Sequence, residues 1–339
     1  MTKPTLFGSF KGVDIEQVTL TSDAGATASI ITYGAVLRDL LVPSKGGPQR
    51  VVLGYDTFDF YPAHSPYFGA ACGPVANRID QGRFTIDGVT YELDRNQGGK
   101  HTLHSGKDNL GRRPWTIVAH DRRSVTLATV SEDGDMGFPG RLVATCTYIL
   151  AEPATLRVIF TATTDKATPI NFAHHSYFNL DGSADILDQR LQVFADLRTV
   201  TDADLIPTGE IVSVGGTPWD FRADRPIRFD TPEGPYKYDG NFVLKSVGTL
   251  AHAATAWSPK SGVTLECWTT EPGLQFYDGA KIHSPEPGLG GTVYGGRAGF
   301  CLEAQRFPDA VNKAHFLGGV TRPGEVYRQT TEYRFGRKD

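Results

Sequence analysis

Short runs of alternating apolar and polar residues recur along the whole chain. They lie at 27–33, 36–42, 83–86, 89–93, 124–130, 142–150, 155–163, 262–270 and 325–335. A period of two is typical of β-strands that bury one face and expose the other. No window of about 12 or more residues shows the amphipathic period and the caps of a helix. The pattern therefore predicts an all-β protein.

Turn residues separate these runs. Between 83–86 and 89–93 stands Asp87-Gly88, which supplies the positive φ angles of a tight type I′ turn and predicts a hairpin. We find no internal repeat, low-complexity linker or shift in composition that divides the chain. We therefore expect residues 1–339 to form a single domain, a large antiparallel β-sandwich.

The charge balance narrows the range of partners. Lys and Arg number 34, Asp and Glu number 38, and the formal net charge is −4. Because the chain has no basic run of the kind that binds a phosphate backbone, we expect no nucleic acid partner. A neutral or weakly charged small molecule fits this composition better.

Cysteines and apolar runs bear on the compartment. The four cysteines are far apart and form no C-x-x-C pair, which argues against a thiolate zinc site and against a disulfide framework. No apolar run reaches the ~18 residues that a membrane span needs, and residues 1–17 lack the apolar core of a signal peptide. We expect a cytoplasmic protein, monomeric or homodimeric, that does not bind a membrane.

Two adjacent histidines stand in the run 171–180, NFAHHSYFNL. Neighbouring side chains on a strand point to opposite faces, so His174 and His175 cannot share one environment there. The face that carries His175 also carries Tyr177 and Asn179 and suits the wall of a cleft. The face of His174 has a phenylalanine at each end and suits packing. We expect His175 to be the histidine in the cleft.

A carboxylate at Glu303 follows the apolar residues 300–302. A buried carboxylate without a partner is costly, so Glu303 either faces water or lies in a pocket with a raised pKa. The second position suits a general base. Upstream, His101 and His104 form an H-x-x-H pair in a glycine-rich stretch. The spacing fits either loop histidines or, less well, a metal pair.

Further polar and aromatic residues are candidates for binding a ligand. Asn77, Arg78 and Asp239 stand in turn contexts, where they either bind a polar ligand or hold the loop. The flat faces of aromatic residues can stack on the C–H groups of a sugar or belong to the core. The aromatic residues considered are Tyr177, Phe178, Trp219, Phe276 and Tyr277.

The chain resembles the aldose 1-epimerase (galactose mutarotase) family over most of its length. Two motifs are the most specific: HSYFNL at 175–180 and LEAQRFPDA at 302–310. Further similar stretches, in the family's order, are 31–43, 51–79, 91–106, 133–142, 170–182, 206–222, 238–244 and 271–279.

The resemblance implies a supersandwich with an open carbohydrate-binding cleft, and an enzyme that interconverts the α and β anomers of a free aldohexose of the glucose or galactose type. It implies that His175 is the general acid at the ring oxygen, Glu303 the general base at the anomeric hydroxyl, and His104 a second partner of the ring oxygen. The residues implied or expected to bind the sugar are Asn77, Arg78, Asp239, Gln275 and Tyr177.

The implied chemistry needs no metal and no cofactor. A carboxylate and an imidazole on opposite sides of the sugar ring can remove one proton and deliver another, then act in reverse when the ring recloses. We expect a bell-shaped pH dependence, with the carboxylate on the acid limb and the imidazole on the alkaline limb.

Four positions depart from the family pattern. Pro74 stands where Arg is frequent, His174 where Asn is common, Ser105 where Gly is usual, and Gly240 where His is common. None of them removes the acid, the base or the second histidine. They bear on which sugar is preferred, which the sequence does not determine.

Three other functions compete with this hypothesis. One is an epimerase for a modified sugar such as a sugar phosphate, which would want an extra basic cluster at the cleft. Another is a non-catalytic carbohydrate-binding or sensing protein, which would tolerate the loss of Glu303 or His175. A two-carboxylate glycosidase is less favoured, because the expected partner of Glu303 is a histidine.

Overall fold

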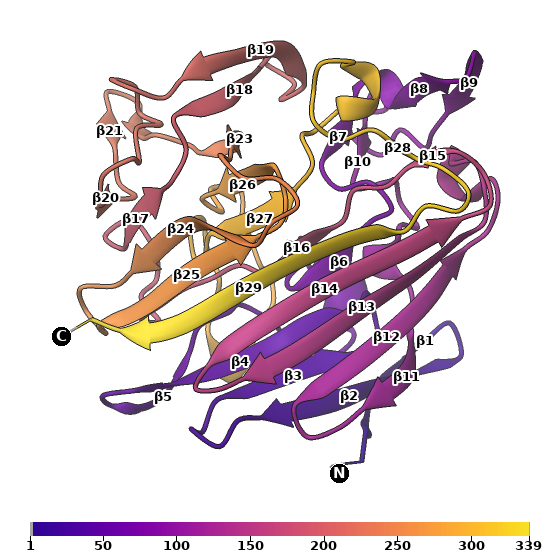
Figure 1. Cartoon of the computed structure of the whole chain (residues 1–339). Coiled ribbons are helices and arrows are strands. Elements are labelled where there is room, and N and C mark those ends of the chain that lie inside the picture. Colours follow the sequence, from indigo (N-terminus) through magenta and orange to yellow (C-terminus); the bar gives the residue numbers. More distant parts are fainter. Residues whose placement is uncertain (1–2, 339) are drawn as a thin grey trace.

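The computed structural model describes residues 3–338, and nearly all of their regular structure is β. The named strands pair antiparallel, and the all-β prediction is confirmed (Figure 1). Within these residues, no helix is long and apolar enough to cross a membrane. The helices are α1 (Phe60–His64) and the 3₁₀ turns Asp80–Gly82, Leu110–Arg112, Asp135–Gly137, Leu289–Gly291 and Ala310–Asn312.

The first sheet is a meander of five strands in sequence order. They are β1 (Thr5–Phe10), β2 (Val13–Thr21), β3 (Thr27–Ile31), β4 (Val36–Ser44) and β5 (Gly47–Arg50). The alternating runs at 27–33 and 36–42 correspond to β3 and β4.

The second sheet has nine strands and contains the longest ones. In spatial order they are β11 (Thr116–His120), β12 (Ser124–Ser131), β13 (Leu142–Ala151), β14 (Thr155–Thr164), β29 (Tyr327–Arg337), β25 (Val263–Thr269), β24 (Ala251–Trp257), β17 (Arg190–Val193) and β20 (Arg225–Pro226). The C-terminal strand β29 thus lies in the middle of the sheet, between β14 and β25.

The third sheet also has five strands. In spatial order they are β19 (Pro207–Ser213), β18 (Leu197–Thr201), β23 (Asp239–Val243), β26 (Gly273–Tyr277) and β27 (Cys301–Gln305). The remaining strands form pairs: β6 (Ala70–Cys72) with β16 (Ala173–His175), β7 (Arg78–Ile79) with β10 (Thr102–Leu103), β8 (Arg83–Ile86) with β9 (Val89–Glu92), β15 (Thr168–Pro169) with β28 (Val320–Thr321), and β21 (Asp230–Thr231) with β22 (Gly234–Pro235).

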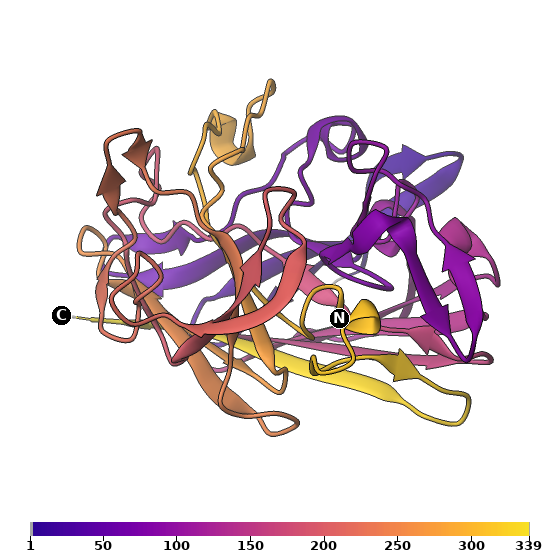
Figure 2. The same ribbon diagram turned by 90° about the horizontal axis from the view of Figure 1, so that it is seen from above.

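The first sheet packs on the nine-stranded sheet through one hydrophobic cluster. Leu20, Ile30 and Leu37 from the first sheet and Tyr148 and Phe160 from the second belong to this cluster and are buried. Along β13 and β14 buried positions alternate with less buried ones, as expected for strands with one core face. Figure 2 shows these layers from above, with yellow β29 running along the molecule.

A close backbone approach holds the strand that carries the two histidines. The Gly69 N–H donates to the carbonyl of His175 at 3.0 Å, and the Leu37 N–H donates to the carbonyl of Gly69 at 2.9 Å. Gly69 has a φ of +66°, and a Cβ there would lie 2.0 Å from the Leu37 oxygen. Only glycine therefore lets β4 and the chain leading into β6 approach this closely.

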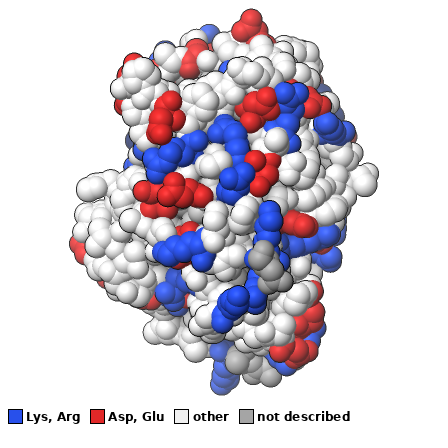
Figure 3. All heavy atoms as spheres, turned by 90° about the vertical axis from the view of Figure 1, so that its left-hand side faces the viewer, with Lys and Arg blue, Asp and Glu red and all other residues white. Residues whose placement is uncertain are grey.

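The surface carries charges of both signs. On the side of the molecule that carries β17, β20 and β21, basic and acidic side chains are interspersed (Figure 3). Ion pairs there include Arg190–Asp224 at 3.0 Å, Arg222–Asp220 at 2.8 Å and Arg228–Asp188 at 3.3 Å.

Candidate active site

The two adjacent histidines lie in different environments, as the period of a strand requires. β16 ends at His175, and its pairing with β6 sets the direction of both side chains. His174 is buried away from the cleft, where its Nε2 lies 2.7 Å from the Ser176 hydroxyl and its Nδ1 lies 3.3 Å from the Tyr148 hydroxyl. His175 lines a cleft of about 280 Å³. The expected division between the two rings is found.

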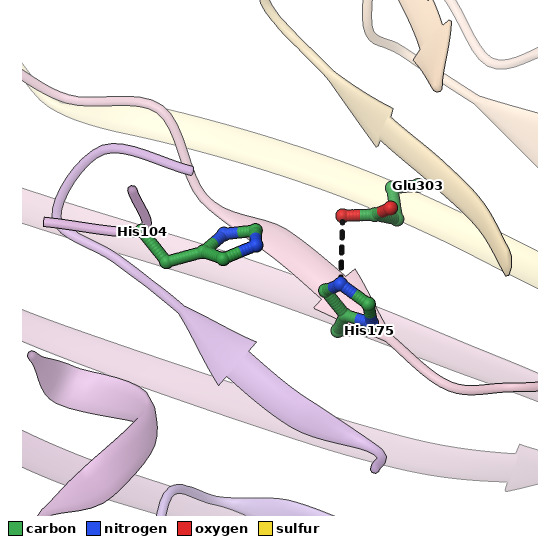
Figure 4. Close-up of side chains that lie close together, drawn as sticks. All are labelled: His104, His175 and Glu303. Atoms are coloured by element: carbon green, nitrogen blue, oxygen red, sulfur yellow. Dashed lines mark ion pairs between the residues drawn. The ribbon is translucent and has the colours of Figure 1, made fainter. Parts of the chain in front are cut away.

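Glu303 lies opposite His175 in this cleft. It is the middle residue of β27, next to Gln275 of β26, and only 2% of it is exposed. Its Oε2 lies 3.6 Å from His175 Nε2 (Figure 4). Of the two positions considered for this carboxylate, the buried pocket is the observed one.

His104 approaches the same point from a turn after β10. It has a φ of +47°, and its N–H donates to the carbonyl of Asn77 at 2.8 Å. Its Nδ1 accepts the Asn77 N–H at 3.2 Å, which leaves Nε2 for the cleft. The ring centroids of His104 and His175 are 5.2 Å apart. Three residues remote in sequence thus meet at one place (Figure 4).

Burial controls the protonation of these groups. Desolvation raises the pKa of Glu303 to about 8; the charge of Asp239 adds to the rise and Arg78 opposes it. Desolvation lowers the pKa of His175 to about 4. The pKa of His104 is held well below its usual value, first by burial and then by the nearby His175, Arg78 and Arg112.

It follows that Glu303 and His175 together bind one proton between about pH 4 and about pH 8, and that the free protein holds this proton on the carboxyl. These pKa values favour the reverse of the expected order of the limbs. The imidazole accounts for the acid limb and the carboxyl for the alkaline one, because both groups are removed from water and each favours its neutral form.

Arg78 and Asp239 line one wall of the cleft, and Gln275, which is not among the lining residues, lies behind them. Arg78 Nη2 lies 3.5 Å from Asp239 Oδ2, and Gln275 Nε2 donates to Asp239 Oδ1 at 2.6 Å. Arg78 Nε also donates to Gln97 Oε1 at 3.0 Å. Asn77, beside Arg78, lines the cleft as well. These alternating donors and acceptors can bind the hydroxyl groups of a sugar.

Aromatic side chains form other parts of the wall. Tyr177 and Tyr277 line the cleft, whereas Phe178, Trp219 and Phe276 belong to the hydrophobic core. Sequence reasoning missed Tyr67, whose ring centroid is 4.7 Å from that of His104. It also missed Gln97, Leu103, Pro66 and Lys281 as lining residues. Local pattern gave no signal for these positions, because the cleft joins segments far apart in sequence.

The H-x-x-H pair is divided by the fold. His101 is not among the lining residues and instead lies 3.2 Å from Asp80 and 3.4 Å from Asp204. A different set of metal donors exists: the ligand atoms of His104, His175 and Glu303 lie within 4.8 Å of one another. Two imidazoles and a carboxylate are donors that zinc or iron accepts, so this set needs an experimental test.

Two of the four departures have a local explanation. Ser105 keeps the left-handed backbone that glycine usually supplies, with a φ of +68°, and its hydroxyl bonds both the N–H and the carbonyl of Val75. At Gly240 a Cβ would lie 2.7 Å from the Trp219 ring, so the tryptophan occupies the space of a side chain there.

Comparison with known proteins decides the family. The family model described as aldose 1-epimerase matches residues 16–334. The chain is 39% identical over 339 residues to a galactose mutarotase of Rattus norvegicus, covering 98% of this chain and 97% of that one. It is 36% identical over 328 residues to an aldose 1-epimerase of Escherichia coli (strain K12), covering 94% of each. The chain belongs to the aldose 1-epimerase family.

Solved structures agree with this assignment. A GalM/aldose epimerase homologue from C. elegans superposes with a TM-score of 0.90 at 30% identity, covering 95% of this chain and 99% of that one. A galactose 1-epimerase from Lactobacillus acidophilus shares the fold, with a TM-score of 0.85 at 24% identity, covering 99% of each. The expected sandwich fold is confirmed, and so is the expected activity, the interconversion of aldose anomers.

We predict that this activity does not depend on a metal ion. The pair of Glu303 and His175 can supply both proton movements, so protein treated with EDTA and then dialysed should catalyse mutarotation at the untreated rate. The measurement is the optical rotation of freshly dissolved α-glucose or α-galactose. Activity that disappears on chelation and returns with zinc would instead assign the three-donor set to a metal.

Proposed function

We propose that the cleft binds a free aldohexose of the glucose or galactose type, and that Glu303 and His175 open and reclose its ring. The observation that carries the proposal is one carboxyl opposite one imidazole, 3.6 Å apart, in a buried polar cleft. The relatives named galactose mutarotase and aldose 1-epimerase support this class of substrate.

Opening the ring requires two proton movements. The hydroxyl on the anomeric carbon loses a proton, and the ring oxygen gains one as its bond to that carbon breaks. A sugar hydroxyl that donates to Glu303 favours the ionised carboxylate, so the shared proton moves to His175. Glu303 then takes the proton of the anomeric hydroxyl while His175 Nε2–H protonates the ring oxygen.

Reclosure uses the same groups in reverse. The open aldehyde rotates about its C1–C2 bond and presents its other face. His175 removes the proton of the former ring hydroxyl as that oxygen attacks the carbonyl, and Glu303 returns a proton to the aldehyde oxygen. Both groups end as they began. Atoms, protons and electrons therefore balance without a cofactor.

The neighbouring residues bind and polarise the sugar in this mechanism. His104 Nε2–H donates to the ring oxygen beside His175. Asp239 accepts a hydrogen bond from Gln275 and forms an ion pair with Arg78, which keeps these polar atoms in place for the sugar hydroxyls. Asn77 completes this wall and Tyr177 offers an apolar face.

A free sugar fits the cleft better than a sugar phosphate. Apart from the two histidines, the basic residues among those that line it are Arg78 and Lys281, and Arg78 is paired with Asp239. A phosphate would therefore meet one unshared cation and the carboxylate of Asp239. We further propose a reducing, cytoplasmic setting, which the four free and buried cysteines support.

The direct test of this function is the rate of mutarotation with Glu303→Gln as the control. We expect the variant to fold normally and to lose about 10²–10⁴-fold in kcat, because an amide cannot accept the proton of the anomeric hydroxyl. Polarimetry gives the rate, and circular dichroism checks the fold. A folded variant with a rate close to that of the natural chain would remove Glu303 from the role of base.

The two histidines should respond differently to the same substitution. His175→Asn removes the group that protonates the ring oxygen and should lower kcat by about 10²-fold or more while sugar binding persists. His174→Asn removes contacts with Ser176, Tyr148 and Tyr333, none of which lines the cleft, so it should lower stability and leave turnover nearly intact. The two variants are compared by their initial rates of mutarotation and by calorimetric measurement of sugar binding. Equal loss of turnover in two folded variants would contradict the assignment.

The pH dependence of kcat/KM should reflect the binding of the one proton that Glu303 and His175 share. Below about pH 4, His175 binds a second proton and no group remains to accept the proton of the anomeric hydroxyl. Above about pH 8, Glu303 ionises and the pair has no proton for the ring oxygen. We therefore expect a bell with limbs near these values, after subtraction of the spontaneous reaction. A profile that is flat through both regions would contradict a shared catalytic proton.

A further inference from the structure

The nitrogen of His175 that faces away from Glu303 has its own partner. Cys301 Sγ lies 3.5 Å from His175 Nδ1, and both side chains are buried. Cys301 stands two residues before Glu303 on β27, so strand geometry sends both side chains to the same face of the sheet. One strand thus supplies the groups that meet the two nitrogens of the imidazole.

The side chain of Tyr177 is another polar neighbour of the Cys301 thiol. Tyr177 lies near enough to Cys301 to lower the pKa of its thiol, against the larger rise that burial causes, and the Tyr177 hydroxyl donates to the carbonyl of Pro66 at 3.1 Å. A carbonyl oxygen can only accept a hydrogen bond, so the hydroxyl proton of Tyr177 is used in this bond. The tyrosine oxygen is then free to accept the S–H of Cys301. The sulfur in turn is free to accept from the imidazole.

An S–H that points toward the Tyr177 oxygen would set which nitrogen of His175 carries its proton. In a neutral imidazole one nitrogen donates and the other accepts, and the partner of one nitrogen sets the state of the other. With Nδ1–H donating to the sulfur, Nε2 is left as an acceptor. Nε2 is the atom 3.6 Å from Glu303 Oε2, so it can receive the proton of the carboxyl.

His104 is held in the opposite state. Its Nδ1 accepts the backbone N–H of Asn77, so in the neutral ring its proton is on Nε2. His104 therefore presents a fixed N–H donor to the cleft, whereas His175 presents a nitrogen that can gain and lose a proton. The two rings differ in this way although both are buried and share the same cleft.

We propose that Cys301, oriented by Tyr177 and Pro66, is a positioning residue that holds His175 in the Nδ1–H tautomer, and thereby makes His175 the ring that exchanges a proton with Glu303. The thiol does not touch the sugar or the reacting atoms. It acts through His175, as the groups behind metal-bound and catalytic histidines do. The inference deepens the proposed function and rests on it for its kinetic consequence.

The test compares Cys301→Ala with Cys301→Ser and with the matched control Cys267→Ala. Cys267 is equally buried but lies on β25, in the nine-stranded sheet. Nitrogen-15 NMR of histidine-labelled protein, between about pH 4 and about pH 8, reads the tautomer of His175 directly. The signals of His175 are assigned by their loss in His175→Asn. Polarimetry gives kcat and KM.

We expect the natural chain and Cys267→Ala to show the Nδ1–H tautomer of His175. Cys301→Ser should show it too, because the serine hydroxyl can replace the thiol as both acceptor and donor of hydrogen bonds. Cys301→Ala should show mixed tautomers and a fall in kcat of about 10-fold or more, with KM little changed. The serine variant should regain most of the lost kcat.

Three outcomes would overturn the proposal: an Nε2–H tautomer in the natural chain, an alanine variant with unchanged tautomer and kcat, or a serine variant as impaired as the alanine variant in both. The last would assign the effect of Cys301 to packing. The NMR measurement of the tautomer does not require catalysis. A natural chain with Nδ1–H at His175 but no mutarotation would therefore refute the proposed function and leave the proposed role of Cys301 in orienting His175 standing.

Discussion

The burial of Glu303 opposite a neutral imidazole is the constraint on which the rest of the site depends. A change in its pKa from 4.5 to about 8 corresponds to roughly 5 kcal/mol in favour of the neutral carboxyl. The same desolvation lowers the pKa of His175 to about 4. Near neutral pH both groups therefore favour their neutral forms in the free protein. The two therefore share one proton, and a sugar hydroxyl that reaches Glu303 can move it between them.

The sheets supply the rigidity that such a pair requires. In the third sheet Asn241, Gln275 and Glu303 are direct cross-strand neighbours, so register alone sends their side chains to one face. The short pair of β6 and β16 brings His175 to that face from another part of the chain. The backbone contacts between Asn77 and His104 fix the third group. A shift of register by one residue would turn the strand side chains among them to the opposite face.

Local features were readable from the sequence because they depend on neighbours along the chain. The alternating runs became β12, β13, β14, β25 and β29, and Asp87-Gly88 became the turn between β8 and β9. The alternation of side chains along a strand correctly placed His174 and His175 on opposite faces. An apolar run ending in a carboxylate correctly marked Glu303 as a candidate for a buried pocket.

Other features depend on contacts that alternation does not encode. The position of β29 between β14 and β25, and the approach of Tyr67 to His104, join segments far apart in sequence. H-x-x-H spacing gave no means of separating His101 from His104, since only the fold sends one to the acid pair of Asp80 and Asp204. The pKa values of Glu303 and His175 favour the reverse of the expected order of the limbs, because burial of both groups is a property of the assembled cleft.

The central claim is that Glu303 holds the shared proton in the free protein, and infrared difference spectroscopy tests it most directly. The spectrum of the natural chain minus that of Glu303→Gln isolates this carboxyl from Glu271, whose pKa burial also raises, to about 7. At a pH midway between about 4 and about 8, we predict the carbonyl band of a protonated carboxyl, which weakens as the pH passes about 8. A carboxylate band at that pH, with no protonated band, would contradict the account.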